Sequence, residues 1–146
     1  MSASTDIGAT LAFASGAPAT FDSAGYGAMS FTTVSHLVSL PEIGTSDATI
    51  AAPDLTSGYT QTLKGASTGK AGTVMVRDEG DSDAGQAAVQ AASATTAENS
   101  FKITYANGKV IYITGPVMNW KRNAATDTSY AGFSFDMFNN HREVYA

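Results

Sequence analysis

Apolar and polar residues alternate over several short stretches of the chain, and turn-forming residues separate these stretches. The clearest example is the pair 101–105 and 110–114, in which Ile103 faces away from its polar neighbours. Asn107-Gly108 lies between the two stretches and is the dipeptide that favours a type I′ turn, where both central residues have positive φ. The pattern therefore predicts an antiparallel β-hairpin.

Similar alternation predicts further strands. Residues 131–138 place Phe133, Phe135 and Met137 on one face of a strand, and we expect this strand to pair with 117–121. Three more segments are predicted to be strands: 10–14, 32–40 and 73–78.

One segment, 81–95, has helical instead of strand periodicity. Small residues recur there at helical spacing, and the predicted packing stripe consists of Ala84, Ala87, Ala88, Ala91 and Ala94. Val89 and Ala92 widen this stripe. Three residues can cap the first turn: Asp81, Ser82 and Asp83. A short helical turn is also predicted at 21–28, with Asp22 as its cap.

The segment 41–71 is rich in Gly, Thr, Ser and Ala, and only 48–52 and 59–63 are β-like. We expect a long loop here, because a segment of this length inside a small domain is usually functional or ordered by a partner. The predicted fold is therefore a single mainly β domain (α+β) with one α-helix. Residues 1–8 and 139–146 are expected to form a terminal arm and tail.

The charge content is unusually low for a soluble domain. Charged residues make up 14% of the 146 residues, against about 25% in a typical domain. Either the surface is simply rich in Ser, Thr and Gly, or much of it is buried against neighbours. The net charge of −5, and the absence of Lys and Arg before Lys64, argue against tight nucleic-acid binding.

Composition also limits the compartment and the chemistry. The chain has no cysteine, which excludes disulfides, thiolate metal sites and a cysteine nucleophile. No apolar run approaches the roughly 18–20 residues of a membrane-spanning helix. The first residues lack the positive charge and apolar stretch of a secretory signal, so we expect the protein to stay where it is made or to leave by lysis.

Candidates for catalysis are few. His36 lies in a predicted strand and His141 in the polar tail, and neither is near an acid and a nucleophile in the sequence. The acidic segment 78–83 lacks the spacing of a calcium loop, and helix capping explains it. Residues 65–70 are one residue too short for a phosphate loop, and Ala71 follows where Ser or Thr is needed. We therefore expect no enzyme, no metal and no cofactor.

Four aromatic residues leave a second class of function open: Tyr105, Tyr112, Trp120 and Tyr130. They could form a stacking platform of a soluble β-sandwich binding module, of a carbohydrate-binding type. Alternatively they are core and cross-strand residues of a β-sheet.

The order of several segments along the chain resembles a known family. These segments are Pro18-Ala19-Thr20-Phe21-Asp22-Ser23-Ala24-Gly25-Tyr26-Gly27-Ala28-Met29, Leu40-Pro41-Glu42-Ile43-Gly44, Leu63-Lys64-Gly65, Asp83-Ala84-Gly85-Gln86-Ala87-Ala88, Phe101-Lys102-Ile103-Thr104, Asn107-Gly108 and Tyr112-Ile113-Thr114-Gly115-Pro116-Val117. Over about residues 10–138 the chain resembles the major tail tube proteins of long, flexible-tailed phages. Gene transfer agents and phage-derived bacteriocins carry similar tubes.

The resemblance implies a fold, an assembly and a location. The fold would be a β-sandwich or half-barrel with a flanking helix. Its sheet edges would close into homo-hexameric rings, and stacked rings would form a tube for DNA that is not specifically bound. Expected partners are the tape-measure, tail terminator and distal tail proteins, in a virion tail assembled in the host cytoplasm, with no membrane. Pairing of open strand edges and low charge both suit such a polymer.

The resemblance also assigns a role to the segment 41–71, which would reach a neighbouring subunit or ring. The residues expected to make that contact are Ile43, Ile50, Leu55, Tyr59, Leu63 and Lys64. Acidic residues expected at the lumen or between rings are Glu42, Asp47 and Asp54. We expect this segment to be mobile in the free monomer and ordered in the tube.

Overall fold

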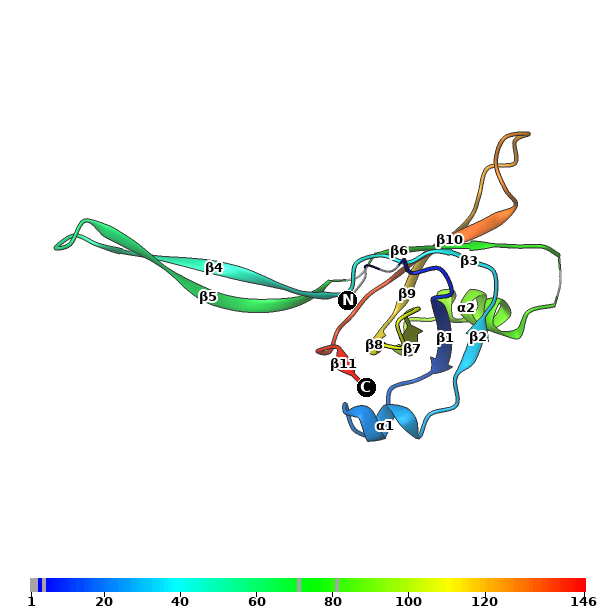
Figure 1. Cartoon of the computed structure of the whole chain (residues 1–146), viewed down its shortest axis with the longest axis horizontal. Helices are drawn as coiled ribbons and strands as arrows, with labels where there is room; N and C mark the ends of the chain where they lie inside the picture. Colours follow the sequence, from blue (N-terminus) through cyan, green and yellow to red (C-terminus); the bar gives the residue numbers. More distant parts are fainter. Residues whose placement is uncertain (1–2, 4, 71, 81) are drawn as a thin grey trace.

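The structure is a computed structural model that describes residues 3, 5–70, 72–80 and 82–146. Within these residues the chain forms antiparallel sheets and is mainly β (Figure 1). The elements, in chain order, are β1 Thr10–Ser15, α1 Ser23–Gly27, β2 Thr32–Val34, β3 Leu37–Ser39, β4 Gly44–Asp54, β5 Tyr59–Lys70, β6 Thr73–Arg77, α2 Ala84–Ser93, β7 Asn99–Thr104, β8 Val110–Gly115, β9 Val117–Arg122, β10 Gly132–Met137 and β11 Val144–Tyr145.

Two of the sheets share one hydrophobic core, and we call this part of the molecule the body. The five-stranded sheet has the order β11-β8-β7-β1-β2, and the four-stranded sheet has the order β3-β6-β10-β9. Phe101 of the first sheet stacks on Phe135 of the second, with ring centroids 6.1 Å apart. Both rings are fully buried, so apolar burial between the sheets stabilises the body.

The strands with clear alternation form as predicted. In β10, Phe133, Phe135 and Met137 are buried while the residues between them are partly exposed. This strand pairs with β9 and also with β6. The pairing of 131–138 with 117–121 is thus confirmed, as are the strands expected at 10–14 and 73–78.

The hairpin predicted at 101–114 is also present, but its turn is of another type. Among the described non-glycine residues only His36 and Asn119 have positive φ, so Asn107 cannot form a type I′ turn. Instead, Gly108 N donates to Tyr105 O, and Gly108 has a φ of 88°. This is a type I turn followed by a left-handed glycine, a three-residue connection that also matches the twist of the strands.

The prediction of a single strand at 32–40 is wrong, because the chain bends at His36 and continues in the other sheet. His36 has a φ of 62°, and here the chain leaves β2 of one sheet to enter β3 of the other. The corner is fastened to α2: Ser35 N donates to Asp83 Oδ2, and Gln86 Nε2 donates to Ser35 O. These bonds connect residues about fifty positions apart, which local periodicity cannot reveal.

The helix predicted at 81–95 forms at 84–93, but its buried face differs from the expected one. Asp83 is the N-cap, and Asp81 lies outside the described residues. The buried residues are Gly85, Gln86, Val89 and Ala92, whereas Ala84, Ala87 and Ala91 are exposed and Ala88 is half-buried. A Cβ on Gly85 would lie 2.2 Å from the carbonyl oxygen of Thr33, so glycine lets α2 approach β2 closely.

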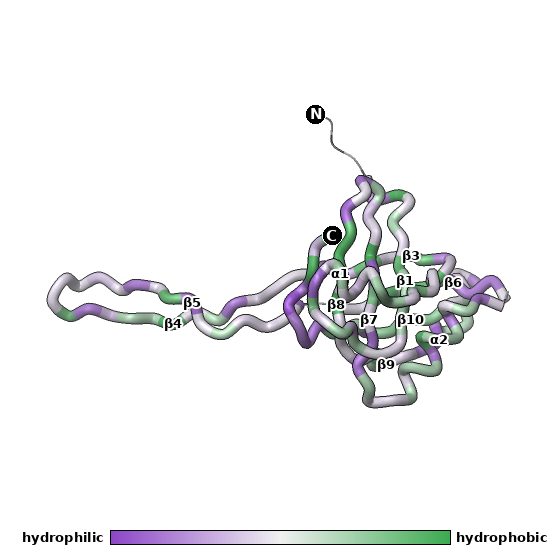
Figure 2. Tube along the Cα trace, turned by 90° about the horizontal axis from the view of Figure 1, so that it is seen from below, coloured by the Kyte–Doolittle hydropathy of each residue, from purple (hydrophilic) through white to green (hydrophobic). Residues whose placement is uncertain are grey.

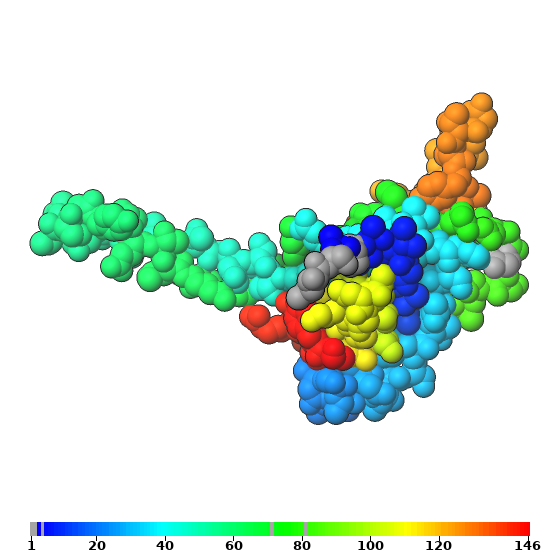
Figure 3. Space-filling model, viewed as in Figure 1, coloured from blue at the N-terminus to red at the C-terminus, as the bar shows by residue number. Residues whose placement is uncertain are grey.

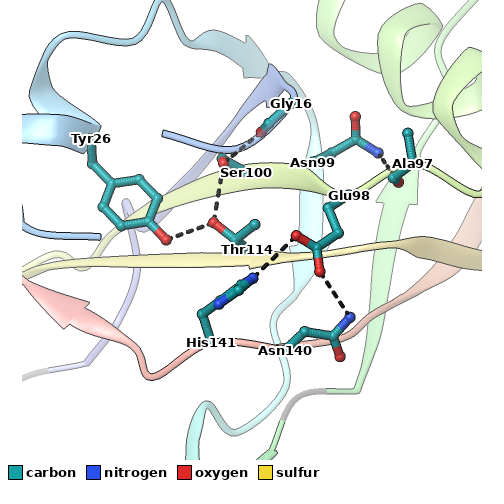
Figure 4. A network of polar contacts seen from close by, with 9 residues as sticks. All are labelled: Gly16, Tyr26, Ala97, Glu98, Asn99, Ser100, Thr114, Asn140 and His141. Carbon is teal, nitrogen blue, oxygen red and sulfur yellow. Dashed lines mark hydrogen bonds and ion pairs between the residues drawn. The ribbon is translucent and has the colours of Figure 1, made fainter. Parts of the chain in front are cut away.

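The turn expected at 21–28 is the short helix α1, so the described part of the chain has two helices, not one. Asp22 is its N-cap as predicted. Tyr26 of this helix is fully buried, stacks on Tyr112, and its hydroxyl lies 2.6 Å from Thr114 Oγ1 (Figure 4). Burial raises the pKa of Tyr26. This neutral hydroxyl pair holds α1 against the five-stranded sheet.

Two segments expected to be irregular contain paired strands. The long loop predicted at 41–71 contains the paired strands β4 and β5, and the tail predicted at 139–146 contains β11, which pairs with β8. Residues 1, 2 and 4 of the predicted arm, and Ala71, lie outside the described residues. No helix in the described part of the chain is long and apolar enough to cross a membrane.

Candidate functional site

The most prominent surface feature is the protruding hairpin, by which we mean residues 44–70. Its strands β4 and β5 pair with each other in a separate two-stranded sheet. The hairpin extends away from the body in the ribbon and in the space-filling view (Figures 1 and 3). The 11 residues of β4 would span about 36 Å at the usual rise of a strand.

Most side chains of the protruding hairpin are exposed, including apolar ones. Ile50 and Leu63 face each other across the strands, and they are 52% and 49% exposed. Tyr59 lies four residues before Leu63 on β5, so the two share a face, since alternate residues of a strand do so. Tyr59 is 74% exposed. Leu55 at the tip is 99% exposed. Apolar residues are therefore found along the hairpin outside the core (Figure 2).

The opposite face of the hairpin has a different character. By strand alternation it consists of Thr49, Ala51, Pro53, Thr60, Thr62 and Lys64. Small and β-branched residues with hydroxyl groups dominate this face. The two faces of the hairpin thus differ: the large apolar side chains lie on one face, together with Gln61 and Asp54, and three threonines lie on the other.

The tip of the hairpin is closed by its own residues. Asp54 Oδ1 accepts a hydrogen bond from Thr56 N, Asp54 Oδ2 accepts one from Ser57 Oγ, and Gly58 N donates to Asp54 O. Gly58 has a φ of 69°, which favours glycine. The hydrogen bonds from Ser57 and Thr56 lower the pKa of Asp54. Asp54, expected at the lumen or between rings, therefore also stabilises the turn at the tip of the hairpin.

The strands change register in the middle of the hairpin. The shift lies between Asp47 and Thr49, where β5 has two residues opposite one residue of β4. Asp47 accepts a hydrogen bond from Ser67 Oγ and lies 3.7 Å from Lys64 Nζ. The hydrogen bond from Ser67 lowers the pKa of Asp47 most, and the charge of Lys64 lowers it further.

Side chains from both sides meet where the hairpin joins the body. Lys70 Nζ lies 2.8 Å from Glu42 Oε2, and this bond lowers the pKa of Glu42. Thr45 Oγ1 donates to Glu143. Ile43, expected to contact a neighbouring subunit, is half-buried and packs against the core. Of the six expected contact residues, the structure thus brings Ile50, Tyr59 and Leu63 onto one face, and leaves Leu55 at the tip and Lys64 at the bulge.

The four aromatic residues expected in a stacking platform are placed differently. Tyr112 is buried and stacks on Tyr26 in the five-stranded sheet, whereas Trp120 packs on Phe133 in the four-stranded sheet. Tyr105 packs partly against the core, and Tyr130 is 40% exposed. Two of the four rings are therefore occupied by packing in different sheets.

Two acidic residues outside the hairpin, Asp78 and Glu98, make contacts within the body. Asp78 accepts a hydrogen bond from Gly80 N and lies 3.0 Å from Arg122 Nη1, and these contacts lower its pKa. Glu98 lies 3.1 Å from His141 Nε2. Across the described residues, no group of three or more His, Asp or Glu side chains could hold a metal ion.

The open edges of the body sheets are a further feature. The edge strands β2, β3 and β11 have only two or three residues each. The fourth edge strand, β9, has six residues, but Asn119 interrupts it with a φ of 58° and Lys121 lies on it. Short strands and edge lysines limit unspecific pairing. The connection 123–131 projects from the body beside this edge (Figure 1).

Neither a scan against protein-family models nor a search of curated proteins finds a match to this chain. The hairpin and the body are therefore the features from which a function can be inferred. The sequence pointed to four exposed apolar residues of the hairpin, Ile50, Leu55, Tyr59 and Leu63, but not to their place on paired strands. It also carries no signal for the close contact that Asn139 makes with the base of the hairpin at Gly69.

Proposed function

We propose that this protein is a structural subunit of a phage-type tail tube, whose copies form rings that stack into a hollow conduit for DNA. The observation that carries the proposal is the protruding hairpin. An isolated two-stranded hairpin is marginally stable in water, and this one exposes Ile50, Leu55, Tyr59 and Leu63. Such a hairpin gains order and buries apolar area when it lies against another molecule.

The size of the gain supports a polymer of identical subunits. Burying the exposed part of each of these side chains contributes roughly 1–2 kcal/mol. A single hairpin gives a weak contact of this kind, but a ring and a stack repeat it for every subunit. The sixfold symmetry of the ring is implied by the resemblance in sequence. Partners would be further copies of the chain, together with tape-measure, tail terminator and distal tail proteins.

The charges agree with a conduit in a virion tail. The net charge is −5, so DNA would pass without the phosphate contacts that hold it in specific complexes. Among the three candidate acids, Glu42 and Asp47 each lie near a lysine, whereas Asp54 bonds to uncharged residues. We therefore propose Asp54 as the first acid to test at the lumen or between rings.

The proposal is tested by the assembly state over a range of protein concentrations. We expect light scattering after size exclusion to detect large species, and negative-stain electron microscopy to show rings or hollow tubes. The double variant Ile50→Ser, Tyr59→Ser removes half of the exposed apolar side chains of the hairpin. It should need at least about tenfold more protein to assemble, since about 2 kcal/mol per contact is lost.

The matched control changes two exposed apolar residues of the body, in the variant Met118→Ser, Tyr130→Ser. It should assemble like the unchanged chain if the hairpin makes the decisive contact. Equal assembly of the hairpin variant and the unchanged chain would refute the role of the hairpin. A monomer at all concentrations, also after addition of purified tail-tip complexes as seeds, would refute the tube.

A further inference from the structure

The protruding hairpin has two long free edges, in contrast to the sheets of the body (Figure 1). Its strands β4 and β5 have 11 and 12 residues, and in the described part of the chain they form a sheet of their own. The body edges β2, β3 and β11 have two or three residues each, and Asn119 with its positive φ interrupts β9. A long free edge presents unpaired N–H and C=O groups, to which a strand of another molecule can bind. Strand pairing between molecules is therefore least hindered at the hairpin.

Pro53 makes the two edges of the hairpin unequal. It lies on β4 opposite Thr60 of β5, and a proline in a strand directs its nitrogen away from the neighbouring strand. The backbone groups of Thr60 then also point away from β4, because the two residues of such a pair do not bond to each other. By alternation the same holds for the next pair of this kind, Ala51 and Thr62. The free edge of β4 thus lacks a donor at Pro53, whereas the free edge of β5 has donors at Thr60 and Thr62.

The free edge of β5 is regular and uncharged over residues 59–63. The pairing with β4 continues without a shift up to Lys64, and the register change of the hairpin follows only after that residue. The sequence of this stretch is Tyr-Thr-Gln-Thr-Leu, without proline and without a charged side chain. Prolines, bulges and charged side chains are the features by which proteins usually prevent edge pairing. None of them is found within this stretch.

The same stretch is complementary to itself. Two antiparallel copies that keep equivalent faces on the same side can pair with Gln61 opposite Gln61. Thr60 of each copy then lies opposite Thr62 of the other, and the backbone groups of these two residues point toward each other. Tyr59 lies opposite Leu63, and a shift in either direction separates this apolar pair. Thr–Thr pairs stabilise antiparallel sheets, and the apolar pair buries exposed area.

We propose that the free edge of β5 binds the same edge of a second copy of the chain. The two hairpins then form one continuous antiparallel sheet in the order β4-β5-β5-β4. The contact has twofold symmetry, so it closes a dimer and does not propagate into a chain of subunits. It uses the edge of the hairpin, whereas the proposed tube uses the exposed apolar side chains on its face. The dimer therefore goes beyond the proposed function and does not depend on it.

The first test removes one N–H group from the free edge of β5. Thr62→Pro does so without removing a bond between β5 and β4. The matched control Ala51→Pro removes an N–H group from the free edge of β4, at the opposite residue of the same pair. Circular dichroism checks that both variants keep the fold. Light scattering after size exclusion measures the mass over a range of concentrations, and the mass also separates a dimer from larger rings.

We expect a species of twice the chain mass for the unchanged chain and for Ala51→Pro. Thr62→Pro should need about tenfold more protein to form this species, because each of the two copies loses one hydrogen bond. A monomer without any dimer in the unchanged chain would overturn the proposal. Equal dimerisation of Thr62→Pro and Ala51→Pro would also overturn it, since the contact would then not use the edge of β5.

The second test examines the register and needs no proline. Because the chain has no cysteine, single cysteines can be introduced in Gln61→Cys and, as the control, in Ala52→Cys. In the proposed dimer the two copies of residue 61 form a pair without backbone bonds, with Cα atoms about 4.5 Å apart, which a disulfide can span. Residue 52 lies opposite residue 61 on β4. Its two copies would be three strand spacings, or about 14 Å, apart.

Under mild oxidation, Gln61→Cys should therefore form a disulfide-linked dimer at least about tenfold faster than Ala52→Cys. Non-reducing gel electrophoresis of samples taken over time measures both rates at the same protein concentration. Equal rates for the two variants would mean that the β5 edges do not meet at residue 61, and would overturn the proposal.

Discussion

The protruding hairpin and the hairpin β7–β8 of the body are both antiparallel strand pairs, but they have very different surroundings. Ile50 pairs with Leu63 in the first, and Ile103 pairs with Ile111 in the second. The first pair is about half exposed, whereas Ile103 is fully buried and Ile111 is 8% exposed. Backbone pairing is thus common to both, and only the second hairpin is covered by another sheet.

This difference separates the forces that shape a strand from those that stabilise it. The tip bonds of Asp54 and the cross-strand pairs are enough to define the protruding hairpin locally. They add little stability, because the net contribution of one hydrogen bond to the free energy of unfolding is about 1 kcal/mol. Exposed apolar pairs also contribute less than buried ones. The body should therefore unfold as one unit, while the hairpin responds mainly to what it contacts.

The largest contrast is expected for apolar truncations. Phe135→Ala leaves a cavity between the sheets and should lower the free energy of unfolding by about 3–5 kcal/mol. Leu63→Ala on the hairpin should lower it by less than about 1 kcal/mol, since Leu63 is 49% exposed. Urea unfolding followed by circular dichroism measures both values. A loss of about 3 kcal/mol or more for Leu63→Ala would show that the hairpin belongs to the folding core.

Glycine substitutions should give the next largest contrast. In Gly115→Ala the new Cβ would lie 1.8 Å from Phe138 O, and the backbone shift should cost about 2–3 kcal/mol. Gly44 begins the protruding hairpin, and a Cβ there would meet nothing within 4 Å. Gly44→Ala should thus change the stability by at most about 0.5 kcal/mol. Similar losses for the two variants, measured by thermal unfolding, would contradict the close approach at Gly115.

Removal of a single hydroxyl group should have a smaller effect. Tyr26→Phe removes the buried bond to Thr114 and should lower the free energy of unfolding by about 1–2 kcal/mol. Tyr59→Phe, at 74% exposure on the hairpin, should be neutral within about 0.5 kcal/mol. Urea unfolding distinguishes them, and equal values would argue against the bond that holds α1.

The smallest effect should be a local pH response at the tip of the hairpin. The bonds from Ser57 and Thr56 lower the pKa of Asp54, so they stabilise the tip above its ordinary pKa of 3.8 and are lost as the pH falls through the lowered value. The protection factor of the Thr56 amide, which is its intrinsic exchange rate divided by the rate measured by NMR, should therefore fall below about pH 4 while the body stays protected. In Asp54→Ala, this protection factor should be low at every pH. A constant protection factor of Thr56 in the native chain down to about pH 2 would contradict the bond.

The sequence by itself determined those strands of the body that are buried on one face. Such strands alternate, and the alternation alone assigns Phe133, Phe135 and Met137 to the core. The helix caps Asp22 and Asp83 were also predictable, because capping depends on residues within one turn.

Only the tertiary structure decided the protruding hairpin, the corner at His36 and the face of α2. Both faces of β4 and β5 are exposed, so no burial imposes alternation, and the segment resembles a loop in the sequence. The stripe of alanines on α2 was a misleading signal, because the face with Gly85 and Val89 packs closer to β2 and buries more apolar area. The candidate site was therefore predictable in its residues but not in its shape, since long-range contacts and solvent exposure leave no periodic pattern.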